Sequence, residues 1–236
     1  TELWVLKGIS FKLPIKKSIA LVGENGSGKT TIVKLITRLY EPTKGEILLN
    51  NIPINKYNLI EYRKLFGVTF QDFAKFYFTV EDNVKFGEID RNIPLNEIIK
   101  ISKKTHMHNK IMNFPFRYKT ILGRRFEKGH EISHGEWQKI AIARALIRKA
   151  PIYILDEPTA SLDARAEYKV FKAFQQYTKN KTAVFISHRF SNVKLADEII
   201  VIDNGKIKEK GTHTELMNRK KAYYKLYTFQ AKRYED

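Results

Sequence analysis

The sequence predicts an α/β fold that carries an inserted helical subdomain, and three observations support this prediction. First, a short apolar run at Ser18–Val22 ends in a glycine-rich loop, and apolar residues then recur at helical spacing over residues 30–40. Second, similar strand-like runs return towards the C-terminal end of the chain. Third, residues 72–150 are mostly helical in pattern and richer in polar residues. We therefore expect an α/β core at residues 1–75 and 151–236, with the helical subdomain at residues 76–150.

The individual elements are expected from apolar periodicity and from turn residues. Pro42 and Gly45 end the first helix, because neither residue continues a helix well. Asn204-Gly205 is a strong signal for a two-residue hairpin. A C-terminal helix is expected over residues 214–230, where apolar residues share one face. Beyond the first strand, the expected strands are residues 46–49, 66–70, 152–155, 183–186, 199–202 and 206–208.

The composition is that of a globular protein with a sizeable core. Of the 236 residues, 43% are hydrophobic and 29% are charged, which suits one large domain or a domain with an inserted subdomain. No run approaches the roughly 18 apolar residues that a membrane-spanning helix needs. The absence of cysteine excludes a disulfide framework and thiol chemistry. The chain opens at Thr1 inside an apparent strand and without a leader, which indicates a domain of a longer protein.

The net charge of +18 is compatible with several kinds of surface. Lys and Arg residues are spread along the chain, without a block of five or more like charges. A solvated basic surface is the plain interpretation. A surface near anionic lipid headgroups and a nucleic-acid groove are the alternatives.

The glycine-rich loop matches the phosphate-binding pattern G-x-x-x-x-G-K-[ST]. Glycines let successive backbone N–H groups curl round an anion, and the following helix points its positive end at the same place. In this interpretation Lys29 supplies a positive charge to the outer phosphates, Thr30 ligates Mg²⁺ and Thr31 reaches the inner phosphate. The alternative is a glycine turn with a solvated lysine, which the strand–loop–helix context disfavours. The expected ATP-binding residues are Gly23, Glu24, Asn25, Gly26, Ser27, Gly28, Lys29, Thr30 and Thr31.

Residues 152–157 form an apolar run that ends in two carboxylates. Asp156 can hold Mg²⁺ through water, and Glu157 can polarise an attacking water. Two acids at a strand end can also be an ordinary loop entry. In a chain that has a phosphate loop they are the expected partner for phosphoryl transfer, with Glu157 as the general base.

Three polar residues follow other strand-like runs: Gln71 after LFGVTF, Asp163 in SLD, and His188 after AVFIS. Strand ends are usually polar, so each residue alone is better explained as structural. Their order around the other motifs favours a function, because the whole set resembles one family.

That family is the ABC (ATP-binding cassette) ATPases, and the resemblance covers nearly the whole chain. The most specific element is ISHGE at residues 132–136, followed by WQKIAIARAL, in the place of the family signature LSGGQ. Exporters are indicated by TILGRRFEKG, by FQDFAKFYFTVEDNV and by GTHTEL, and the chain looks most like bacterial peptide or lantibiotic exporters. The family fold is a phosphate-loop NTPase core with an N-terminal antiparallel β portion and an inserted α-helical subdomain.

The resemblance implies roles for the polar residues. Gln71 would sense Mg²⁺ and the transmembrane partner, and His188 would contact the γ-phosphate, so both join Glu157 as catalytic residues. Thr30, Gln71 and Asp156 would surround the metal. The loop that contains Asp163 would communicate across a dimer.

The resemblance also implies partners. Ser133, Gly135 and Glu136 would bind the γ-phosphate of ATP held by a second ATPase domain, identical or different, so that two ATP molecules lie in a head-to-tail dimer. A transmembrane domain, upstream in the same polypeptide, would use the ATP hydrolysis for export. The chain would work at the cytoplasmic face of a bacterial membrane, and no nucleic-acid partner is expected.

Two departures from the family pattern concern binding residues. The signature has His134 in place of a glycine and Glu136 in place of a glutamine. Ser133 and Glu136 nevertheless fit a capping box, which starts a helix with either Glu or Gln at its third position. The adenine-stacking aromatic of exporters lies upstream of a segment like VLKGISF, where this chain offers only Trp4.

Two other functions remain open from the sequence. A soluble ABC ATPase acting on nucleic acid is favoured slightly by the charge and disfavoured by the exporter-like loop. A regulatory sensor that binds ATP without turnover is disfavoured by Glu157 and His188.

Overall fold

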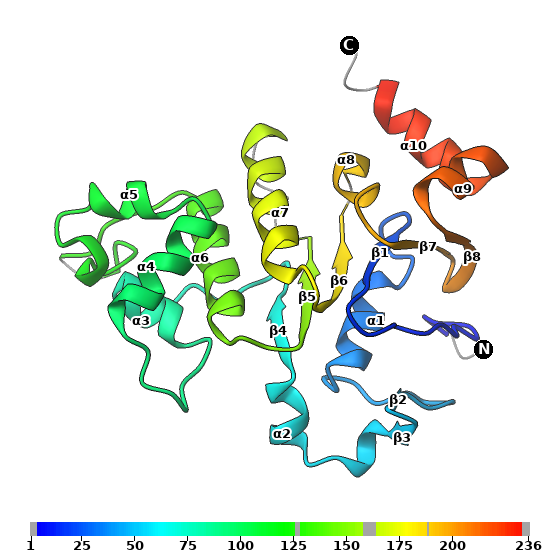
Figure 1. Ribbon diagram of the computed structural model, residues 1–236, viewed down its shortest axis with the longest axis horizontal. Helices are drawn as coiled ribbons and strands as arrows, with labels where there is room; N and C mark the ends of the chain where they lie inside the picture. Colours follow the sequence, from blue (N-terminus) through cyan, green and yellow to red (C-terminus); the bar gives the residue numbers. More distant parts are fainter. Residues whose placement is uncertain (1–3, 126–127, 158–163, 188, 233–236) are drawn as a thin grey trace. The chain divides into compact units, whose positions relative to one another are not determined.

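A computed structural model describes residues 4–125, 128–157, 164–187 and 189–232. The chain divides into two compact units (Figure 1). The first unit comprises Thr1–Phe66, Pro151–Glu157 and Asn180–Asp236, and the second comprises Gly67–Ala150 and Pro158–Lys179. The units therefore separate near residue 66 and again at residue 150, and the stretch after residue 157 belongs to the second unit. The expected division at residues 75 and 150 stays a prediction.

The first unit contains five strands of a six-stranded mixed sheet, in the order β5-β6-β1-β7-β8. Neighbouring strands are parallel except for the antiparallel pair β7–β8. The central strands are apolar along their length and almost entirely buried, as expected of parallel strands covered on both faces. The bounds are β1 Ser18–Val22, β5 Ile152–Asp156, β6 Thr182–Ile186, β7 Glu198–Asp203 and β8 Lys206–Gly211.

The first helix, α1 (Lys29–Ile36), ends four residues earlier than its apolar pattern predicts. The chain leaves the helix at Arg38, which has a φ of 53°. The Arg38 guanidinium donates to the carbonyl oxygens of Ile54 and Tyr57 at 2.9 and 3.0 Å. These two acceptors lie sixteen or more residues away, so the early end depends on a distant segment.

The single helix expected over residues 214–230 is wrong, because the structure has two helices, α9 (His213–Arg219) and α10 (Ala222–Lys232). Between them Lys220 adopts the left-handed conformation with a φ of 52°. The start of α10 is held by β8, since Glu209 Oε2 accepts the backbone N–H of Tyr223 at 2.7 Å. A carboxylate from a neighbouring strand thus decides where the second helix begins.

The remaining elements of the first unit are short. An antiparallel pair, β2 (Leu48–Leu49) and β3 (Ile52–Pro53), is followed by η1 (Ile54–Lys56), α2 (Leu59–Lys64) and, later in the chain, α8 (Phe190–Val193). The described N-terminal segment, residues 4–17, contains no strand. Within it the Trp4 ring lies 5.3 Å from Lys44 Nζ.

The second unit is helical and packs around α6 (His134–Ile147), which contacts α3 and α4 (Figure 1). Its core contains the fully buried side chains of Ile98, Met107, Ile111 and Leu122, with Trp137 almost as deeply buried. The chain enters this unit along β4 (Phe66–Thr69). The other elements are α3 Val80–Lys85, α4 Leu95–Lys104, α5 His108–Met112, η2 Arg117–Lys119 and α7 Ala164–Thr178. Among the described residues, no helix combines the length and the apolar character needed to span a membrane.

Candidate functional site

The phosphate loop begins where β1 ends, and the neighbouring strand requires its first glycine. β1 pairs with β7 so that Val22 lies opposite Val201. Gly23 has a φ of 150°, and a Cβ at this position would lie 2.0 Å from the carbonyl oxygen of Ile202. A side chain cannot fit so close to a backbone oxygen. The chain can therefore enter the loop in this path only through glycine.

The loop ends at Gly28, which is the N-cap of α1 and adopts the left-handed conformation with a φ of 104°. A Cβ here would lie 2.5 Å from Leu6 Cδ2. Among the described residues, no side chain caps this helix. The backbone N–H groups of its first turn thus remain available to an anion, and the positive end of the helix dipole favours the same position.

The Lys29 side chain folds back onto the loop. Its Nζ donates to the carbonyl oxygens of Gly23 and Glu24 at 2.9 and 2.8 Å, and it lies 3.4 Å from Ser27 Oγ. Only 6% of Lys29 is exposed. Burial lowers the pKa of Lys29, and the carboxylates of Glu157 and Asp156 act in the opposite direction. A desolvated ammonium group in a loop of backbone dipoles suits a strongly charged anion such as a phosphate chain.

The two acids lie at the end of β5, as the sequence predicts. Asp156 is the last residue of the strand, opposite Ile186 of β6, and is completely buried. Glu157 adopts a φ of 48°, and its backbone N–H donates to the Ile186 carbonyl oxygen at 3.1 Å. A left-handed glutamate costs on the order of 1–3 kcal/mol, and such strained residues cluster at functional sites. The turn redirects the chain at the residue expected to polarise water.

The oxygen donors in this part of the first unit are suited to a divalent cation. Thr30 lies in the first turn of α1 next to Lys29, and the Asp156 carboxylate is close enough to Lys29 to influence its pKa. A hydroxyl and a carboxylate, completed by water and phosphate oxygens, are ligands that Mg²⁺ prefers. The described residues hold no cluster of three or more His, Cys, Asp or Glu side chains, but the expected set needs only one carboxylate.

The other predicted residues lie either in the second unit or outside the described residues. Gln71 lies exposed in the turn that follows β4, in the second unit. Asp163 and His188 lie outside the described residues. The structure therefore brings together the residues of the phosphate loop with Asp156 and Glu157.

The signature segment starts α6 with the capping box that its sequence predicts. Ser133 Oγ accepts the backbone N–H of Glu136 at 3.2 Å, and Glu136 Oε2 accepts the backbone N–H of Ser133 at 2.9 Å. Gly135 is buried, and the His134 ring lies 5.4 Å from the Phe73 ring. The departure from glutamine to glutamate therefore preserves the helix start.

Sequence reasoning missed Arg144, which ties α6 to the segment after Gln71. Its guanidinium donates to the Ala74 and Asn83 carbonyl oxygens at 3.1 and 3.0 Å, and to Asn83 Oδ1 at 3.0 Å. It also lies 4.5 Å from the Phe76 ring. Burial lowers the pKa of Arg144 to about 10. The signal that could have found it was a charge inside the apolar run IAIARALI, which indicates a buried cation with partners.

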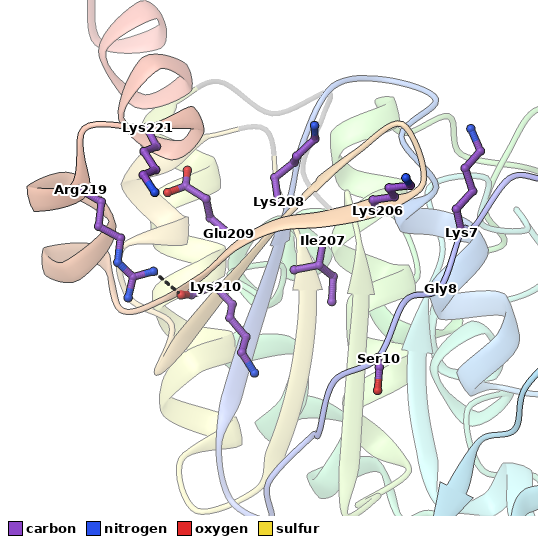
Figure 2. Close-up of a pocket in the computed structure, with 10 residues that line it drawn as sticks. All are labelled: Lys7, Gly8, Ser10, Lys206, Ile207, Lys208, Glu209, Lys210, Arg219 and Lys221. Carbon is purple, nitrogen blue, oxygen red and sulfur yellow. Dashed lines mark hydrogen bonds between the residues drawn. The ribbon is translucent and has the colours of Figure 1, made fainter.

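A basic cleft of about 600 Å³ lies beside β8 in the first unit and is separate from the phosphate loop (Figure 2). In Figure 2, the ammonium groups of Lys208 and Lys210 point in opposite directions, so they do not converge on one position. Arg219 donates to the Lys210 carbonyl oxygen at 2.9 Å. This arrangement is typical of a solvated basic surface. The lining residues are Lys7, Gly8, Ser10, Lys206, Ile207, Lys208, Glu209, Lys210, Arg219 and Lys221.

Comparisons with known proteins agree with this geometry. The family profile described as ABC transporter matches residues 6–160, more than half of the chain. The subtilin transport ATP-binding protein SpaT of Bacillus subtilis is 41% identical over 94% of this chain and 36% of its own length. The human mitochondrial iron-sulfur clusters transporter ABCB7 is 40% identical over 98% of the chain and 30% of its own length. The ATP-dependent lipid A-core flippase of Haemophilus influenzae is 40% identical over 95% of the chain and 38% of its own length.

A solved structure shows the same fold. The structure of a bacterial Atm1-family ABC exporter with ATP bound matches 96% of this chain and 39% of that chain, with a TM-score of 0.90 and 32% sequence identity. The expected fold class is thereby confirmed, and the chain spans about a third of the length of these relatives. The chain belongs to the ABC transporter family, and within it to the ATP-binding, ATP-hydrolysing domains of the exporter type.

Proposed function

We propose that this domain binds MgATP and uses its hydrolysis to drive export through membrane-spanning segments of a longer protein. The observation that carries the proposal is the arrangement around Lys29, where a glycine loop, an uncapped helix start and two carboxylates lie together. Relatives about three times as long as this chain support the presence of further domains.

The chain's own residues supply binding and orientation. Lys29 moves from the loop carbonyls to the outer phosphates, and the free N–H groups of the α1 first turn bind the phosphate oxygens. Glu157 accepts a hydrogen bond from the attacking water and so directs the water oxygen at the γ-phosphorus. The strained Glu157 backbone places this carboxylate beyond the end of β5.

Thr30, Gln71 and Asp156 would hold Mg²⁺, directly or through water. The metal, when bound, neutralises charge on the phosphate oxygens. His188 would contact the γ-phosphate and Asp163 would act across the dimer, as the family resemblance implies. Their roles are proposals that rest on their positions in the sequence.

A second copy of the domain would complete the site. Ser133, Gly135 and Glu136 start α6, whose positive end would bind the γ-phosphate held by the partner in a head-to-tail pair. Gly135 is buried, and the Ser133 hydroxyl is already fixed by the capping box. Two ATP molecules would then lie between two domains, identical or different.

Peptide cargo and a position at the cytoplasmic face of a bacterial membrane are the finer parts of the proposal. The similarity to SpaT supports peptide cargo, whereas the segments at residues 70–84 and 120–129 support only the exporter type. Transporters named for other substrates are similar to almost the same extent. A transport assay with the complete protein is therefore the test of cargo. No nucleic-acid partner is expected, and the relatives named above are all transporters.

The decisive experiment replaces Glu157 by Gln, which keeps the shape of the side chain and removes its basicity. We expect ATP affinity by calorimetry to stay near the wild-type value, while turnover falls by about 10²–10⁴-fold. ATP should also shift the variant from monomer to dimer in light scattering. The matched control is Glu46→Gln, an exposed carboxylate of the same unit, which should hydrolyse ATP at the wild-type rate. Wild-type turnover in Glu157→Gln would remove Glu157 from the mechanism.

A further inference from the structure

We propose that Lys110 is a positioning residue for the signature segment, because it neutralises the unusual charge of Glu136 where the partner's phosphate would bind. The two groups form an ion pair with 3.2 Å between Lys110 Nζ and Glu136 Oε1. This inference rests on the proposed role of the α6 start in binding the partner's ATP.

Both oxygens of the Glu136 carboxylate have a defined contact. Oε2 accepts the backbone N–H of Ser133 at 2.9 Å, and Oε1 faces Lys110. The first contact starts the helix and would be equally available to a glutamine side chain. The second contact involves the charge itself, and only a carboxylate makes an ion pair with a lysine.

The charge of Glu136 has opposite effects on the helix and on an anionic ligand. A carboxylate in the first turn complements the helix dipole and so favours the helix. The same charge repels a phosphate at the same helix end. A cation paired with the carboxylate removes much of this repulsion and leaves the capping box unchanged. A glutamate at the third helical position therefore becomes compatible with phosphate binding.

Lys110 projects from a helix that is firmly anchored in the second unit. Within α5, Ile111 is completely buried, as is Met107 immediately before the helix. The ring of His108 lies with Nδ1 2.9 Å from the hydroxyl of Tyr118. The Lys110 backbone is thus held in place by contacts that do not involve Glu136. Forming the ion pair therefore orders only the Lys110 side chain.

The structure pairs His134, the other departure in the signature, with an aromatic ring. Its ring packs at 5.4 Å from Phe73, in the segment that follows Gln71. Lys110 is the cation with an observed contact to Glu136 among the described residues. Lys110 lies 22 positions before the first residue of the signature, Ile132, and so is not part of the motif.

The test is a double-mutant cycle with Lys110→Met and Glu136→Gln, measured as the ATPase rate of the chain. Lys110→Met leaves an unpaired carboxylate at the helix start, and we expect the rate to fall by about three- to tenfold, the effect of one charge at a partly exposed helix end. Adding Glu136→Gln should restore the rate to within about twofold of Glu136→Gln alone. The loss in Lys110→Met should shrink at high ionic strength, because salt screens the repulsion.

Two further measurements separate this role from a structural one. ATP affinity measured on the Lys110→Met monomer and its melting temperature should both stay near wild type, because an exposed ion pair contributes little to stability. Lys103→Met is the matched control: it removes the same charge from exposed Lys103 of α4 in the same unit, and its rate should be unchanged.

The outcomes distinguish the inference from the proposed function. If Ser133→Ala abolishes turnover while Lys110→Met is fully active, the signature role stands and the inference on Lys110 is wrong. The inference is also wrong if Lys110→Met is impaired and Glu136→Gln fails to restore it. A fully active Ser133→Ala would instead overturn the proposed role of the signature segment.

Discussion

The phosphate loop and the signature segment are both helix starts suited to an anion, but they are built in different ways. The loop depends on backbone packing: Gly23 lies against a strand carbonyl, and Gly28 leaves α1 without a side-chain cap. The signature start depends on side chains, with Ser133 and Glu136 closing a capping box and Lys110 pairing with the carboxylate. Backbone packing tolerates no added atom, whereas side-chain contacts can be exchanged for others of similar geometry. We therefore expect substitutions at Gly23 to be tolerated less well than substitutions in the signature segment.

The largest expected effect is that of Gly23→Ala. The new Cβ would lie 2.0 Å from the Ile202 carbonyl oxygen, so β1 and β7 would have to move apart. We expect the free energy of unfolding to fall by about 3 kcal/mol or more, from overpacking and backbone strain together. Urea denaturation measures this change.

Gly45→Ala is the matched control, because Gly45 also has a positive φ, 81°, but no atom lies within 4 Å of the position that its Cβ would take. It should lose only about 1 kcal/mol, the cost of a left-handed alanine. Equal losses of unfolding free energy in the two variants would mean that close packing does not determine the conformation of the phosphate loop.

A smaller effect is expected when a capping box is opened. Ser133→Ala in the second unit and Thr212→Ala at the start of α9 remove equivalent hydroxyls, since Thr212 and Glu215 form the same box. Each should cost about 0.5–2 kcal/mol of stability. Only Ser133→Ala should also lower the ATPase rate strongly, because only that box lies in the signature. A parallel loss of activity in Thr212→Ala would show that any opened cap disturbs turnover.

The smallest effect concerns acid stability of the second unit, where side-chain ion pairs hold α4. The guanidinium of Arg91 donates to both oxygens of Glu97 at 2.8 and 2.9 Å, and Lys149 Nζ lies 3.0 Å from Glu97 Oε1. The hydrogen bonds from Arg91, assisted by Lys149, lower the pKa of Glu97 from 4.5 to about 2. A carboxyl group whose pKa is lower in the folded than in the unfolded protein stabilises the fold while it is ionised. This contribution is therefore present above pH 4.5 and is lost as the pH falls towards 2.

Glu97→Gln should therefore reduce stability by about 1 kcal/mol at pH 7, a figure that allows for the partial exposure of the pair. The variant should also lose less stability than the wild type as the pH falls from 4.5 to 2. Thermal unfolding at a series of pH values measures both changes. An unchanged pH profile would mean that the ion pair does not contribute to folding.

Much of the fold and of the site could be predicted because the signals are local. Ser18–Val22 forms a strand with the predicted bounds, since a run of only five residues that ends at a glycine is too short for most helices and favours a buried strand. The hairpin at Asn204-Gly205 and the capping box of Ser133 also form as predicted. Each depends on residues within a few positions of one another.

The features that the sequence did not predict depend on distant partners. The C-terminal apolar pattern continues through Lys220, but Glu209 of β8 accepts the Tyr223 backbone N–H in the first turn of a new helix, α10. Similarly, the sequence displays Arg144 only as a charge in an apolar helix. Its acceptors on Asn83, 61 positions earlier in the chain, are visible only in the structure.

The sequence by itself therefore determined the family, the phosphate loop, the acids at the end of β5 and the start of the signature helix. Only the tertiary structure decided how the charge of Glu136 is balanced and where the helices end. The physical reason is the separation along the chain of the residues that interact. Dihedral preferences, apolar period and capping act between neighbouring residues, so the sequence displays them directly. The contact of Lys110 with Glu136 exists only after the second unit, which contains α5 and α6, has folded, and no local pattern encodes that distance.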